Sequence, residues 1–160
     1  MNKYINHFIK ICKHKYYVGS ILVKSGLYWQ AITHDLSKFS ITEFVPSAKY
    51  FSGDRSPIEA EKEKVGYSAA WLHHKGRNKH HWQYWVDYTH GKLTLCRIPE
   101  KYLYEMAADV VGASKAYLGG KYDPKEPLEY FKKHKITIQE RKCEYDRLCR
   151  EAYAGNDRCN

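Results

Sequence analysis

The fold is decided by the stretch His34-Asp35-Leu36-Ser37-Lys38, in which an imidazole and a carboxylate are neighbours in the chain. Imidazole is the commonest protein ligand for transition metals, and carboxylates complete many such sites. Adjacent residues on a helix point about 100 degrees apart, so His34 and Asp35 reach one ion only if their helix presents its edge to it. Two neighbouring helices must then supply the remaining ligands, which predicts a helical bundle around this doublet.

The sequence on either side of the doublet predicts a succession of amphipathic helices. Apolar residues at spacings of three and four predict a first helix that ends near Gly26. Its apolar face is set by Ile5, Ile9, Cys12 and Tyr16 and is widened by Phe8, Ile11, Val18 and Leu22. A second helix begins at about Leu27, carries the doublet and stops by Ser40. A third begins there, because Ser40 and Glu43 have the spacing of a capping box.

The rest of the chain continues the helical pattern. Residues at helical spacing predict a helix that ends at Gly76, and Pro99 stands at the tolerated first turn of another. Further helices are predicted within residues 124–155, and no convincing pair of alternating strands is found. The prediction is an all-α protein with a single compact helical bundle. It has one domain over residues 1–160, with a core at about 1–118 on which the C-terminal helices pack.

Composition limits the class of protein. No stretch of the 160 residues is long and apolar enough to cross a bilayer. Lysines and histidines interrupt the start of the chain, where a secretory signal would need an apolar run. The five cysteines are an odd set without a C-x-x-C pair, so we interpret them as reduced thiols. We therefore expect a cytoplasmic protein that makes no membrane contact.

The net charge of +9 bears on the choice of partner, because it attracts polyanions over a long range. Nucleotides and nucleic acids are both compatible with it, and so is a solvated basic surface. The sequence also leaves a homodimer open.

Histidine is unusually frequent, with nine residues in the chain. A concentration of imidazoles indicates metal ligands or acid–base groups. His7 is instead interpreted as a packing or surface residue, and Trp71 as a core aromatic.

The string at residues 34–38 resembles the H-D-x-G-K signature of the HD-domain superfamily, with Ser37 in place of the glycine. The resemblance implies a helical bundle of the HD-domain type. It also implies that the doublet binds metal together with a histidine from an earlier helix and an aspartate from a later one. The first metal site would then consist of His14, His34, Asp35 and Asp109. Glu105, one turn before Asp109, is either a carboxylate that orients a ligand histidine or a surface residue.

Residues 70–82 are the most unusual stretch and read Ala-Trp-Leu-His-His-Lys-Gly-Arg-Asn-Lys-His-His-Trp. In HD-domain proteins with two or more metals, histidines in this region hold a second ion, and the resemblance implies His73 and His74. His80 and His81 have no secure counterpart in that signature. The motifs H-D-x-S-K-F, A-W-x-H-H-x-x-R-N-x-H-H-W and E-M-x-x-D together resemble a small uncharacterised family of bacterial and phage proteins, over residues 14–118. The Gly-Tyr-Pro element and extended ligand set of the trinuclear cyclic-dinucleotide phosphodiesterases are absent, which argues against that activity.

The expected function is a metal-dependent phosphohydrolase acting on a nucleotide or related small phosphorylated molecule through a metal-activated water. The cofactor would be one or two divalent transition metal ions: Mn, Fe, Co, Zn or Ni. Lys38, Arg77 and Asn78 would bind the phosphate, while Lys38, His80 and His81 would act in catalysis. Lys38 could equally be a solvated cation at a helix end.

Three other functions stay open. Some HD-domain proteins hold two irons and activate dioxygen, and iron content with oxygen consumption would distinguish them. A nuclease or nucleic-acid binder ranks lower, because an HNH-type core needs a hairpin before a helix and the flanks of residues 73–81 are predicted helical. A non-catalytic binding module stabilised by metal is the last alternative.

Overall fold

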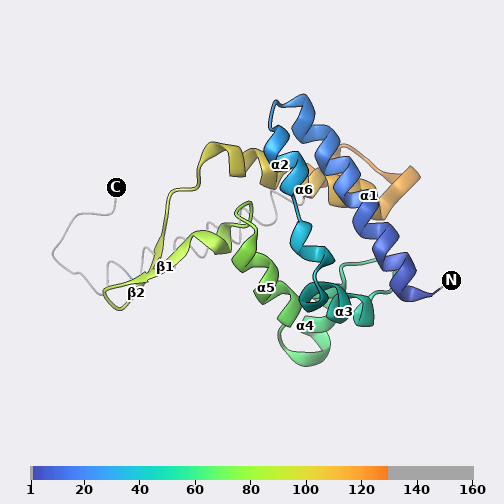
Figure 1. Cartoon of the computed structure of the whole chain (residues 1–160), viewed down its shortest axis with the longest axis horizontal. Helices are drawn as coiled ribbons and strands as arrows, with labels where there is room; N and C mark the ends of the chain where they lie inside the picture. The colour runs from blue at the N-terminus through green and yellow to red at the C-terminus, as the bar shows by residue number, and fades with distance from the viewer. Residues whose placement is uncertain (1, 130–160) are drawn as a thin grey trace. The chain divides into compact units, whose positions relative to one another are not determined.

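The structure, a computed structural model, describes residues 2–129 (Figure 1). The chain divides into two units, one up to Tyr122 and one from Asp123 onward. The elements of the first unit are α1 (Lys3–Lys24), α2 (Tyr28–Thr33), η1 (Leu36–Phe39), α3 (Ile41–Tyr50), α4 (Pro57–Val65), α5 (Ala69–Arg77), η2 (Trp82–Trp85), β1 (Val86–Thr89), β2 (Lys92–Leu95), α6 (Glu100–Leu118) and η3 (Gly119–Lys121). The predicted mainly helical class is confirmed. The helices predicted within 124–155 lie largely outside the described residues.

The long helices α1 and α6 pack against each other around a small apolar core of Val18, Leu22 and Ala108. Their backbones approach closely at Gly112, where an added Cβ would collide with the side chain of Val18 and lie 3.1 Å from its backbone nitrogen. Glycine is therefore required at this crossing. The same crossing holds His14 on α1 beside Asp109 on α6, because each lies about one turn from the contact.

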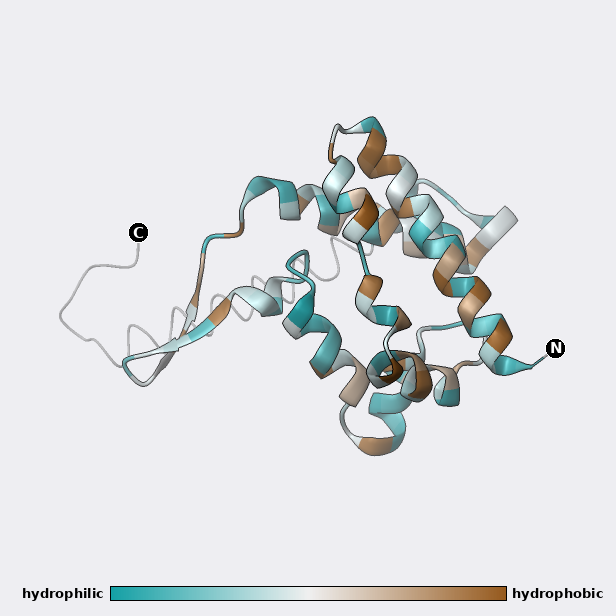
Figure 2. Ribbon diagram, in the orientation of Figure 1, coloured by the Kyte–Doolittle hydropathy of each residue, from teal (hydrophilic) through white to brown (hydrophobic). Residues whose placement is uncertain are grey.

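The buried face of α1 differs from the predicted one. The four residues that set its predicted apolar face, Ile5, Ile9, Cys12 and Tyr16, are all exposed. The buried residues are His7, Ile11, His14, Val18 and Leu22. Apolar residues occur along the whole length of α1 (Figure 2), so hydropathy alone does not choose between its faces. The side that carries two histidines is turned inward, because His14 faces the buried polar centre described below and His7 packs against Phe44 and Phe51.

The chain leaves the helical conformation at the His34–Asp35 doublet. Helix α2 ends at Thr33, His34 has a non-helical backbone with ψ 123°, and Asp35 has a left-handed backbone with φ 54°. The prediction of one helix from Leu27 to Ser40 is therefore wrong, although the predicted start of α3 is correct. The Ser40 hydroxyl accepts a hydrogen bond from the backbone N–H of Glu43, as expected of a capping serine.

A β-hairpin follows α5, so the prediction of an all-α protein without paired strands is wrong in this detail. Strands β1 and β2 are antiparallel, with Val86 opposite Leu95 and Thr89 opposite Lys92. The two turn residues, His90 and Gly91, both have positive φ angles, as a type I′ hairpin turn requires.

Among the described residues, no helix is long and apolar enough to cross a membrane.

Candidate metal centre

The structure brings together the four residues predicted to form the first metal site. His14 comes from α1, His34 and Asp35 from the break after α2, and Asp109 from α6. One ligand atom of each lies within 4.8 Å of the others. The Nε2 atom of His14 is 3.1 Å from both Asp35 Oδ2 and Asp109 Oδ1, and His34 Nε2 is 3.5 Å from Asp109 Oδ1.

The backbone break explains how the two neighbours of the doublet face one centre. On a continuous helix they would point about 100 degrees apart. The left-handed conformation of Asp35 instead turns its side chain to the same region as that of His34. The ammonium of Lys15 donates hydrogen bonds of 2.8 Å to the carbonyls of Ile32 and His34, which satisfies backbone groups left free where α2 ends.

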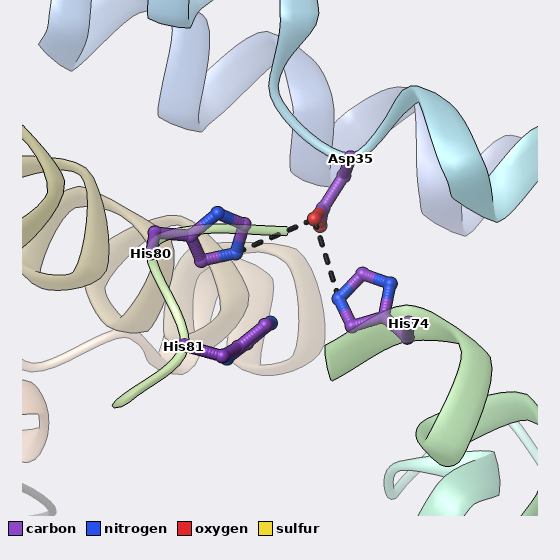
Figure 3. Close-up of side chains that lie close together, drawn as sticks. All are labelled: Asp35, His74, His80 and His81. Atoms are coloured by element: carbon purple, nitrogen blue, oxygen red, sulfur yellow. Dashed lines mark ion pairs between the residues drawn. The ribbon is translucent and has the colours of Figure 1, made fainter. Parts of the chain in front are cut away.

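A second donor set lies beside the first and consists of Asp35, His74, His80 and His81 (Figure 3). The Nε2 atoms of His74 and His80 are 3.3 and 3.4 Å from Asp35 Oδ1. Asp35 therefore turns one carboxylate oxygen to each set, because its Oδ2 atom faces His14. A third group, of His34, His80 and Glu105, overlaps both sets.

Three of the four residues in the second set have a buried ligand atom that makes no hydrogen bond to the rest of the described chain. Asp35 Oδ1, His80 Nε2 and His81 Nε2 are buried and make no hydrogen bond within residues 2–129. Leaving a buried polar atom unsatisfied costs roughly 1–3 kcal/mol, so three such atoms facing one another need a common partner. Imidazole nitrogens and a carboxylate oxygen are a donor set that fits a divalent transition metal ion.

Glu105 on α6 holds a histidine from each set. Its carboxylate accepts hydrogen bonds from the Nδ1–H groups of His34, at 3.0 Å, and His80, at 3.1 Å. With Nδ1 bonded to Glu105, the Nε2 atoms of both rings face the donor groups. Burial alone would lower the pKa of His34, but Asp35, Asp109 and Glu105 outweigh it and raise the pKa, so His34 releases its Nε2 proton when an ion binds. Glu105 was predicted to be either a carboxylate that orients a ligand histidine or a surface residue, and these contacts match the first.

Electrostatics keep the carboxylates of the centre ionised. Burial alone would raise the pKa of Asp35, but the nearby His34, Lys38 and His74 outweigh it and hold the pKa well below its usual range. Hydrogen bonds from His14 and His34 likewise outweigh burial at Asp109 and lower its pKa. A cluster of anionic oxygens suits a cation.

His81 is neutral at physiological pH. Burial and the neighbouring His80 lower the pKa of its imidazole to about 2. A neutral imidazole has a free lone pair, which is the form that binds metal. Trp71 contacts this ring, with the ring centroids 4.8 Å apart. Trp71 therefore lines the second set, whereas the sequence predicted a residue of an apolar core.

The other predicted site residues are placed differently from expectation. His73 lies outside all three donor groups, because it is adjacent to His74 on α5 and points to another side. Asn78 is buried and donates to the Ser37 hydroxyl and the His74 carbonyl, so it is not exposed to a substrate. Arg77 is exposed and donates to His73 Nε2. Lys38 lies beside the centre, 2.5 Å from Asp35 Oδ2.

Two features of the structure were not predicted from the sequence: the contacts of Glu43 and the hairpin. Glu43 is predicted only as a capping residue, whereas its carboxylate lies beside His73 and His74, and nothing in the local sequence signals this. An HNH-type nuclease was not favoured because helices, and no hairpin, were predicted on both sides of residues 73–81. The hairpin before α6 contradicts that prediction. The three donor groups contain no hairpin residue, however, so this arrangement does not form a nuclease core of that kind.

A family model described as "Family of unknown function (DUF5662)" matches residues 3–146. The matched range includes every residue of the three donor groups. No curated protein and no solved structure matches the chain.

Proposed function

The chain belongs to the DUF5662 family, whose function is unknown, and we propose that it is a metal-dependent hydrolase of a phosphoester. A nucleotide or a related small phosphorylated molecule is the substrate class. The observation that carries the proposal is the pair of donor sets that share Asp35, with unpartnered donor atoms in the second. The resemblance of residues 34–38 to the HD-domain signature supports the same chemistry.

The donor sets suit two ions. Asp35 would contact both, with His14, His34 and Asp109 on one side and His74, His80 and His81 on the other. A divalent transition metal supplies Lewis acidity and lowers the pKa of a coordinated water towards neutrality. His80 and His81 are therefore reassigned from catalytic groups to ligands, because their Nε2 atoms lie in the donor set.

Lys38 is the residue placed to bind the phosphate. Its side chain is 26% exposed while Asp35 is buried, so Lys38 lies at the edge of the centre with its ammonium against Asp35. Burial alone would lower the pKa of Lys38, but Asp35 and Asp109 outweigh it and raise the pKa, so the ammonium stays charged. A fixed positive charge here stabilises negative charge on phosphate oxygens during reaction. The net charge of +9 also favours an anionic substrate.

The test is metal content followed by an activity screen. Protein purified without a chelator is analysed for metals, and phosphate release from nucleotides and phosphoesters is then measured with Mn, Co, Fe and Mg. We expect His34→Ala and Asp109→Ala to lose bound metal while keeping their helical circular dichroism, because each removes a donor of the first set. His90→Asn is the matched control, since His90 is an exposed turn histidine outside the donor groups.

Full metal occupancy in both alanine variants would refute the ligand set. Two irons per chain with substrate-dependent oxygen uptake, and no phosphate release, would replace the hydrolase by the di-iron oxygenase alternative.

A further inference from the structure

One buried carboxylate lies next to the centre without belonging to any of the three donor groups. Glu43 lies on α3 and is 2% exposed. It is 2.6 Å from His73 Nδ1 and 2.8 Å from His74 Nδ1, with one carboxylate oxygen to each ring. A buried carboxylate is tolerated only when donors satisfy it, and the two imidazoles do so.

The hydrogen bonds assign the tautomer of both rings. His73 Nε2 accepts from the guanidinium Nε of Arg77 at 2.7 Å, so a neutral His73 carries its proton on Nδ1 and donates it to Glu43. An ionised carboxylate only accepts, so Nδ1 of His74 must also donate to Glu43. The Nε2 atom of His74 is then left with its lone pair, 3.3 Å from Asp35 Oδ1.

Ser37 and Asn78 complete this arrangement. The amide nitrogen of Asn78 lies 2.7 Å from the Ser37 hydroxyl, 2.9 Å from the His74 carbonyl and 3.0 Å from His74 Nδ1. Its two protons go to the two oxygen acceptors, so Nδ1 of His74 keeps its own proton for Glu43. The Ser37 hydroxyl also lies beside the Glu43 carboxylate, whose pKa it helps to lower, and 3.3 Å from His74 Nδ1. A glycine at position 37, as in the H-D-x-G-K signature, could make none of these side-chain contacts. The serine therefore links the segment after the doublet to the helix that carries His74.

We propose that Glu43 is the positioning residue of the second ion. Held by His73 and Ser37, it fixes His74 in the one tautomer and orientation that present Nε2 to the space shared with Asp35, His80 and His81. This inference rests on the proposed metal-dependent function. The effect of Glu43 is confined to the second ion. Within residues 2–129, Glu43 makes no hydrogen bond or ion pair with a residue of the first set, whereas Glu105 contacts both sets.

The test is the stoichiometry and affinity of Co²⁺ binding to the full chain, measured by equilibrium dialysis with elemental analysis and by visible absorbance. Glu43→Gln keeps the shape but places an amide N–H₂ donor against one Nδ1–H, which favours the wrong tautomer of His74. We expect the wild type to bind two ions, and Glu43→Gln to bind one normally and the other about 10–100-fold more weakly.

Three further variants complete the design. Glu61→Gln is the control, since Glu61 is also a buried carboxylate but bonds only to Ser68 among the described contacts, and it should bind both ions normally. Glu105→Gln should weaken both ions. Ser37→Gly, a milder change that retains Glu43, should weaken the second ion alone by about tenfold and covers the case in which Glu43→Gln does not fold.

The outcomes distinguish a failure of the role proposed for Glu43 from a failure of the proposed metal-dependent function. Two ions bound with wild-type affinity by Glu43→Gln, or by Ser37→Gly where Glu43→Gln does not fold, would overturn the role of Glu43 and leave the metal centre intact. Equal weakening of both ions with a lowered melting temperature would reduce Glu43 to a structural residue. A wild-type chain that binds no Co²⁺, Mn²⁺ or Fe²⁺ would refute the proposed function itself.

Discussion

Lys38 shows how a single residue separates metal binding from turnover. Its ammonium contacts Asp35, yet it lies outside the donor groups and is partly exposed. We expect Lys38→Gln to keep the metal stoichiometry of the wild type and to lower kcat/KM for a phosphoester by about 10²-fold, because one fixed charge at a reacting oxygen contributes on that order. Steady-state kinetics on metal-analysed protein measure this. Unchanged kinetics would show that Lys38 only neutralises Asp35.

A second residue-scale effect belongs to His7, which lies between Phe44 and Phe51 with ring centroids 5.3 and 5.0 Å away. Burial, with the nearby charge of Lys38, lowers the pKa of His7 from 6.5 to about 4. Between these values the unfolded chain binds the extra proton, so stability falls as pH falls from about 6.5 towards 4. Relative to pH 7, the free energy of unfolding at pH 5 should lose at most about 2 kcal/mol through this residue.

The measurement compares urea unfolding of wild type and His7→Phe between pH 5 and 7. Because carboxylates of the centre also titrate, only the difference between the two proteins reports on His7. That difference should grow towards pH 5 in favour of His7→Phe, and His90→Asn should show no such trend. Parallel stability profiles would mean that His7 is not held neutral by the fold.

At the scale of elements, the crossing of α1 and α6 sets the distance between His14 and Asp109. Gly112→Ala places a methyl group against Val18. We expect it to destabilise the fold by roughly 1–3 kcal/mol and to weaken the first ion, because α1 must move away from α6. Gly76→Ala is the control, since Gly76 lies in α5 with open space around it and alanine should stabilise that helix by up to about 1 kcal/mol. Thermal melts and Co²⁺ titration measure both effects, and a Gly112→Ala protein as stable as wild type would contradict the close crossing.

The elements also show how far the sequence predicts this molecule. Helical spacing correctly predicts α1 and α6, and the capping serine predicts the start of α3. The single helix predicted to end at Gly76 is wrong, because the chain breaks at Gly66, in a left-handed conformation, into α4 and α5. The resemblance of residues 34–38 to the HD-domain signature implied four ligand residues, and the structure brings one ligand atom of each within 4.8 Å of the others. This succeeded because ligand identity is carried by residue type.

The failures have one physical origin, since they depend on contacts between distant segments. The left-handed backbone of Asp35 has no local signature in a non-glycine residue, so the break in the helix was not predictable. The choice between His73 and His74 depends on which face of α5 turns inward. The hairpin did have a local signal, the alternation on both sides of the His90-Gly91 turn, and that signal was missed.

At the scale of the whole molecule, the described interior is unusual because its apolar core is small and a polar centre fills much of the rest. Apart from Pro57, the buried apolar residues of the described chain include only three larger than alanine: Ile11, Val18 and Leu22. Three of its five largest fully buried side chains are His34, Asp35 and His80. Apolar burial is the main favourable term in folding, so a protein with this interior needs another source of stability. Metal binding to the folded state is the source that the donor groups suggest.

Stability should therefore depend strongly on metal. An ion that binds only the folded chain, present at 100 times its dissociation constant, contributes about 2.7 kcal/mol, which for a chain of this size raises Tm by about 5–10 °C. We expect calorimetry to show such a rise when Co²⁺ or Mn²⁺ is added to chelator-treated protein. The rise should be absent in Asp35→Asn, which weakens the one residue shared by both donor sets, and retained in the Glu61→Gln control. A wild-type Tm that is the same with and without metal would mean that the buried histidines and carboxylates satisfy one another, and that the centre is a hydrogen-bonded polar core.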